Sequence, residues 1–187
     1  MPIALRIRTP IICLLVVLTI IIHFKQHKHL KSEGTKIFKY FLYIALIFIS
    51  SIGTMEITAF YRDIVPFWFN NILDNIIYIS MILLCYMYTF FIMNFIEIKK
   101  KGIQEKNKLV LKLTSIIGCV SLCFFPTKFI VNEPWVYTFG IKALIAYVVL
   151  TIYIIFNLYY LIASRKVINN KNYKCFIETM FIFLFTY

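Results

Sequence analysis

The sequence lacks the short motifs by which enzymes commonly bind phosphate, dinucleotides or catalytic zinc. It contains no glycine-rich phosphate loop, no dinucleotide-binding glycine fingerprint and no zinc-type helix motif. Only three histidines are present, and all of them precede residue 30. Cys85 therefore has no histidine base within reach by sequence spacing, as a nucleophilic role would require. We expect no catalytic residue and no cofactor in this chain.

Metal ligands and paired cysteines are also scarce. His23, His27 and His29 lie close together, but the lysines between them oppose a divalent cation, so the pattern favours a basic segment that meets anionic lipid. The five cysteines have no paired spacing in a polar loop, which indicates reduced, packed thiols: Cys13, Cys85, Cys119, Cys123 and Cys175. No metal site is expected.

Acidic residues are few, with 8 Asp and Glu against 20 Lys and Arg. A net charge of +12 could indicate nucleic-acid binding, but the basic residues occur in short clusters between apolar runs, which membrane topology explains better. What is abundant is apolar sequence: 61% of residues are hydrophobic and the mean hydropathy is +0.84. Soluble domains contain about 45–50% apolar residues, so the bilayer is the expected solvent, and nucleic acid is not an expected partner.

Six apolar runs predict an all-α, polytopic transmembrane helix bundle in a single domain. A helix needs about 20 residues to cross roughly 30 Å of hydrocarbon, and the last run would reach only about 20 Å. We therefore expect five full spans and a truncated sixth. The predicted helices are about 3–24, 37–60, 72–96, 109–127, 139–163 and 175–187.

The first run could instead be a signal peptide, because Arg6 and Arg8 precede it. No small-x-small cleavage site follows it, and the segment after it is basic, so we expect the run to remain as a membrane helix.

Lysine and arginine predict the orientation, because positive residues in short loops stay on the cytoplasmic side. The turns near residues 25–39, 99–112 and 165–174 are lysine-rich. The opposite turns contain Trp68 and Trp135, which are typical of membrane interfaces. We expect a multi-pass protein of the bacterial plasma (inner) membrane with its N-terminus outside.

Glu56 is the first candidate for a binding site. It follows small polar residues near the outer end of the second predicted helix, and intramembrane carboxylates usually face a bundle interior or a water-filled cavity. The alternative is an interfacial Glu56 that is hydrated or paired with Arg62 or Lys142.

Asn70 and Asp74 are the second candidates, because their spacing places them on one helical face at the outer end of the third predicted helix. They could line a pocket that opens outward. Alternatively, Asn70 caps the helix, the interpretation that we favour for this residue, and Asp74 complements the helix dipole.

A resemblance to a known family covers about the first half of the chain. Residues 61–80, YRDIVPFWFNNILDNIIYIS, resemble the outer loop and following helix in the membrane regions of bacterial diguanylate cyclases of the GGDEF family. Residues 23–42, HFKQHKHLKSEGTKIFKYFL, are similar to the basic first loop of those proteins, and Glu56-Ile57-Thr58 resembles an acidic-Ile-Thr turn there. Asp74 stands where the family would have a histidine, and the Gly-Gly-Asp-Glu-Phe motif is absent.

The resemblance implies a membrane-embedded sensory or input domain without its cytoplasmic output domain, which would not make cyclic di-GMP alone. In that hypothesis an unknown small ligand binds near Glu56, Asn70 and Asp74, and a homodimer is consistent with paired output domains. A transport component, such as the substrate-binding membrane subunit of a vitamin importer, is the alternative. A degraded gene product without activity is a third possibility.

Overall fold

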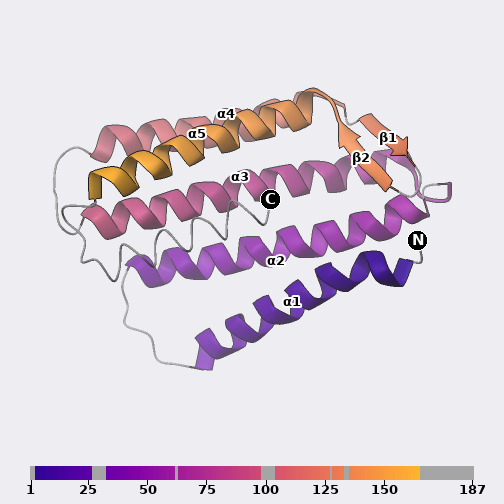
Figure 1. Ribbon diagram of the computed structural model, residues 1–187, viewed down its shortest axis with the longest axis horizontal. Coiled ribbons are helices and arrows are strands. Elements are labelled where there is room, and N and C mark those ends of the chain that lie inside the picture. The colour runs from indigo at the N-terminus through magenta and orange to yellow at the C-terminus, as the bar shows by residue number, and fades with distance from the viewer. Residues whose placement is uncertain are drawn as a thin grey trace.

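The computed structural model describes residues 3–26, 33–61, 63–97, 104–126, 128–132 and 135–164. The elements in chain order are α1 (Ile3–Gln26), α2 (Glu33–Phe60), α3 (Phe67–Glu97), α4 (Gln104–Phe124), β1 (Lys128–Asn132), β2 (Trp135–Phe139) and α5 (Ile141–Ser164). The helices lie roughly along one direction, and consecutive helices run in opposite senses (Figure 1).

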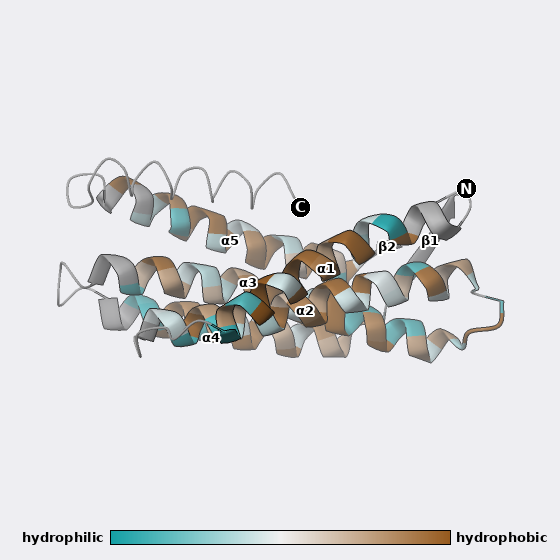
Figure 2. Cartoon of the chain, turned by 90° about the horizontal axis from the view of Figure 1, so that it is seen from below, coloured by the Kyte–Doolittle hydropathy of each residue, from teal (hydrophilic) through white to brown (hydrophobic). Residues whose placement is uncertain are grey.

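Five helices are long and apolar enough to cross a membrane, which confirms the predicted all-α bundle with five spans. Hydrophobic residues recur along all five helices (Figure 2), and many large apolar side chains of α1, α4 and α5 are exposed. An exposed apolar surface of this extent suits lipid rather than water as the surrounding medium. The predicted sixth span lies outside the described residues.

The turns alternate between the two ends of the bundle as the lysine pattern predicts. The start of α1, the α2–α3 turn and the β1–β2 hairpin lie at one end, and the last turns of α1, α3 and α5 lie at the other (Figure 1). We call the first of these the tryptophan end, because it includes Trp68 and Trp135, and the second the lysine end.

Helix α3 is the centre of the bundle, because it packs against α2, α4 and α5. Its buried side chains include Ile82, Cys85 and Met93, and the core continues through Leu111 and Leu122 of α4. Helix α1 is peripheral, and among the described elements its main contact is α2.

Gly118 of α4 faces both α3 and α5. A Cβ atom at this position would lie 3.0 Å from Val149 of α5 and 3.3 Å from Ile82 of α3. Glycine thus leaves room for the side chains of Val149 and Ile82, which a larger residue would force to shift, and small residues are common in membrane helix interfaces.

The β1–β2 hairpin was not predicted from the sequence. The two strands are antiparallel, with Lys128 opposite Phe139 and Asn132 opposite Trp135. Gly140 then joins β2 to α5 with a φ of 128°, a conformation that residues with a side chain rarely adopt. The hairpin therefore occupies residues that we had expected to form a loop and the start of the fifth span.

The helix ends also differ from the prediction. Helices α2, α3 and α4 begin several residues before their apolar runs, because helical backbone hydrogen bonding can continue where polar side chains reach water. Helix α4 ends at Phe124 rather than near residue 127. Since α3 begins at Phe67, Asn70 lies inside its first turn, and the interpretation of Asn70 as a helix cap is wrong.

Candidate functional site

A group of polar side chains is buried at the tryptophan end of α3. Asp74 is 1% exposed, Asn70 is 7% exposed, and Lys142 near the start of α5 is 2% exposed. The Lys142 ammonium donates a hydrogen bond to Oδ1 of Asn71 at 2.8 Å, and the charge of Asp74 acts on the same ammonium. We call Asn70, Asp74 and Lys142, together with the half-buried Asn71 and Asn75, the buried polar cluster.

The position of the cluster follows from helix geometry and from the cost of exposing charge to lipid. Asn70, Asp74 and Tyr78 recur every four residues, so they share the buried face of α3. At about 1.5 Å per residue, Asp74 lies about 10 Å along the axis from Phe67. An ionised carboxylate at this depth is stabilised by facing a basic partner inside the bundle rather than the hydrocarbon.

Two oxygen atoms in the cluster are not satisfied by the described part of the chain. Oδ1 of Asn70 and Oδ1 of Asn75 are buried and accept no hydrogen bond from any described residue. A buried acceptor without a donor costs about 1–3 kcal/mol, so such atoms are rare and mark a position where a donor fits. The cluster therefore combines an acidic side chain of α3 and a basic side chain of α5, which interact electrostatically, with two available acceptors.

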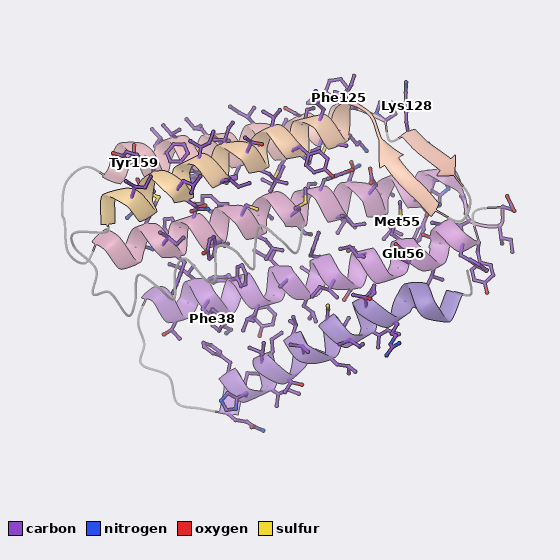
Figure 3. All side chains as sticks on the ribbon, viewed as in Figure 1. Phe38, Met55, Glu56, Phe125, Lys128 and Tyr159 are labelled. Carbon is purple, nitrogen blue, oxygen red and sulfur yellow. The ribbon has the colours of Figure 1, made fainter. Side chains whose placement is uncertain are left out.

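Glu56 is not part of this cluster. The face of α2 that packs against the core carries Phe41 and Phe48, and Ser51 and Thr58 are also buried. Glu56 is half-buried and lies about 140° around the helix from Ser51. Figure 3 shows Glu56 and its neighbour Met55 on different sides of α2.

The flank that carries Glu56 is the one that packs on α1. Gly53, one turn before Glu56, faces Pro10 of α1, where a Cβ atom would lie 3.3 Å from the proline Cβ. Of the three predicted site residues, Asn70 and Asp74 are thus brought together on α3, and Glu56 lies apart from them. Lys142, considered as a partner of Glu56, instead contacts α3.

Lys142, Asn71 and Asn75 belong to the cluster but were not predicted as site residues, and of these Lys142 is the charged one. It is the only charged residue in the apolar run from 141 to 160, and an intramembrane lysine that cannot reach water needs an acidic partner. The sequence thus indicated that Lys142 would have an acidic partner, but it did not indicate which acidic residue this would be. The packing of α5 on α3 decides this in favour of Asp74.

A second set of buried polar groups joins α4 to α5. The hydroxyls of Ser115 and Tyr153 form a hydrogen bond, and the Tyr153 hydroxyl also donates to the carbonyl of Leu111 at 3.1 Å. Nearer the lysine end, Nδ2 of Asn107 donates to the Tyr160 hydroxyl at 2.8 Å. Oδ1 of the buried Asn157 has no hydrogen-bond partner among the described residues.

Within the described ranges, no three His, Cys, Asp or Glu side chains lie close enough together to hold a metal ion. Of the three histidines, only His23 lies within those ranges. No protein-family model, curated protein or solved structure matches the chain. The functional argument therefore depends on the cluster itself.

Proposed function

We propose that the chain is a membrane-embedded sensory or input domain that binds a small polar ligand at the buried polar cluster. The observation that supports this function is the pairing of Asp74 with Lys142 next to two unpartnered amide oxygens. A polar group inside a membrane bundle is costly and is usually retained for a function.

Signalling by such a domain requires that the ligand stabilise one helix arrangement over another. Asp74 and Asn71 belong to α3 and Lys142 belongs to α5, so a ligand that changes their interactions changes how these two helices are held together. The cluster lies at the tryptophan end, which we propose faces the outside of a bacterial inner membrane, with the N-terminus on the same side.

The resemblance of residues 61–80 to membrane regions of GGDEF-family proteins suggests a diguanylate cyclase as the output of this domain. The lysine end would then face the cytoplasm, where such an output domain acts. A homodimer fits this proposal, because output domains of that family work in pairs.

Ligand binding can be tested on the purified chain in lipid nanodiscs by its thermal stability in the presence of small amines, amino acids and carboxylates. A ligand at 100 times its Kd stabilises the folded state by about 2.7 kcal/mol. We expect at least one compound to raise the melting temperature, and Asp74→Asn to remove the effect. The matched control is Asp63→Asn, which alters an exposed aspartate at the same end of the bundle.

If no compound stabilises the chain in an Asp74-dependent manner, the binding site does not exist as proposed. Stabilisation that Asp63→Asn removes equally would reflect surface charge and would also contradict the proposal.

A transport component is the second candidate, and the polar face of α5 favours it. Lys142, Tyr153, Asn157 and Tyr160 are all buried, and together they extend from the tryptophan end toward the lysine end. Such a row could carry a polar solute. Proteoliposomes distinguish the two functions, because an input domain binds the stabilising compound without accumulating it, whereas a transporter fills the vesicle.

A further inference from the structure

We infer that the ligand of the buried polar cluster is a small cation with several N–H donors, a primary ammonium compound, and that it competes with Lys142 for Asp74. This inference rests on the proposed function and narrows it to one chemical class.

The groups of α3 that a ligand would meet in the cluster are hydrogen-bond acceptors. Oδ1 of Asn70 and Oδ1 of Asn75 receive no hydrogen bond from the described residues, and the Asp74 carboxylate can only accept while it is ionised. A primary ammonium carries three N–H donors and no acceptor. The donors of a primary ammonium therefore match the acceptors of the cluster, and its positive charge matches the carboxylate of Asp74.

An anionic ligand matches the cluster less well. The only cation in the cluster is Lys142, and its ammonium already interacts with Asn71 and Asp74. A carboxylate or phosphate would have to separate that pair and would then face Asp74 and two carbonyl-type oxygens, all of which repel it.

Lys142 itself resembles the inferred ligand, because its side chain ends in a primary ammonium. It lies one residue after the start of α5, close to the tryptophan end, and its four-carbon chain is long enough to move a displaced ammonium toward the interface. A free ammonium compound at Asp74 would thus compete with Lys142 and release α5 from its polar contact with α3. This competition provides a physical link between ligand binding and helix arrangement.

The probe for this inference is methylammonium, tested on the full chain in nanodiscs by its effect on melting temperature at constant ionic strength. Tetramethylammonium has the same charge without an N–H donor, and acetate has the opposite charge. We expect methylammonium alone to raise the melting temperature, and Asp74→Asn to abolish the shift.

Removal of the competing side chain gives the sharper result. Lys142→Met should lower the Kd for methylammonium by at least about tenfold, which corresponds to about 1.4 kcal/mol, because Asp74 loses its built-in partner. Lys128→Met, which removes an exposed lysine at the same end, should leave the Kd unchanged. Should Lys142→Met fold poorly, the comparison of methylammonium with tetramethylammonium on the unaltered chain decides the question.

Weaker methylammonium binding by Lys142→Met would overturn the inference, since it would mean that the lysine recognises part of the ligand. Equal stabilisation by tetramethylammonium, or stabilisation by acetate, would also overturn it. If those compounds act in an Asp74-dependent manner, the binding site and the proposed function stand while the ammonium class is wrong. If no compound at all acts through Asp74, the proposed function and this inference fail together.

Discussion

Tyr153 illustrates how single buried polar residues position the helices of this bundle. Its side chain is 1% exposed, and its hydroxyl interacts with both the Ser115 hydroxyl and the Leu111 carbonyl of α4. Many other hydroxyls, such as those of Ser80 and Thr89, bond to the carbonyl one turn earlier in their own helix. A hydrogen bond within one helix satisfies the hydroxyl but does not determine which neighbouring helix packs against it.

Replacement of Tyr153 by phenylalanine should therefore weaken the α4–α5 contact. Interhelical hydrogen bonds in membrane proteins contribute about 0.6 kcal/mol on average and up to about 1.7 kcal/mol, and Tyr153 makes two. We expect Tyr153→Phe to lower the free energy of unfolding by about 1–2 kcal/mol, measured by denaturation with SDS in mixed micelles. Tyr159→Phe is the control, because Tyr159 is exposed on the same helix (Figure 3). An equal effect of the two substitutions would contradict this role of Tyr153.

At the scale of the element, Gly118 decides how closely α4 can approach α3 and α5. An added methyl group would lie 3.0 Å from Val149 and 3.3 Å from Ile82, and both neighbours belong to buried helix faces. We expect Gly118→Ala to lower the free energy of unfolding by about 1–3 kcal/mol through overpacking, measured by the same denaturation.

Gly53→Ala provides a comparison within the chain, because among the described residues its new methyl group would meet only Pro10, at 3.3 Å, on the peripheral helix α1. The Gly53 variant should lose less stability than the Gly118 variant. The reverse order would show that the α1–α2 contact, rather than the junction of α3, α4 and α5, limits the packing.

The helices could be predicted from the sequence, but the hairpin could not. A membrane-spanning segment must satisfy all its backbone hydrogen bonds internally, so a long apolar run has one available structure. The segment from Lys128 to Phe139 is short, and the same apolar and aromatic residues could belong to a loop or to the end of a helix. Its pairing depends on contacts between two strands, which hydropathy does not encode.

The candidate site was predicted in part for a related reason. The four-residue spacing of Asn70 and Asp74 placed them on one face of a helix, and the helix that contains them forms as expected. The distance between Asp74 and Lys142 depends instead on how α3 and α5 pack, and periodicity within each helix gives no information about it. For the same reason, Glu56 could not be assigned to the α1 side of α2 in advance.

At the scale of the whole molecule, charge distinguishes the two ends of the bundle. At the lysine end, the ammonium of Lys39 lies 6.0 Å from the centre of the Tyr43 ring, and that of Lys108 lies 5.7 Å from the centre of the Phe90 ring. Such contacts support lysines at a membrane interface, where the side-chain stem packs on apolar surface and the charge stays near water.

The membrane orientation can be tested with reporter fusions in bacterial cells. An alkaline phosphatase fused after Asp63 should be active, because that turn is expected outside, and the same reporter fused near Lys101 should be inactive. A cytoplasmic reporter at the two positions should give the opposite pattern. Export of the position near Lys101, or retention of the one after Asp63, would reverse the orientation and move the buried polar cluster to the cytoplasmic side.

The position of α1 at the edge of the bundle has a consequence for the history of this sequence. Ile11, Ile12, Leu15 and Val16 are about half exposed, and the helix has its main described contact with α2. At such positions one aliphatic residue replaces another with little effect, whereas Pro10 and Phe24 have specific neighbours in Gly53 and Phe38. Natural selection should accordingly preserve the hydrophobic character of this helix rather than the identity of each residue. Homologous sequences should therefore diverge faster in α1 than in α3.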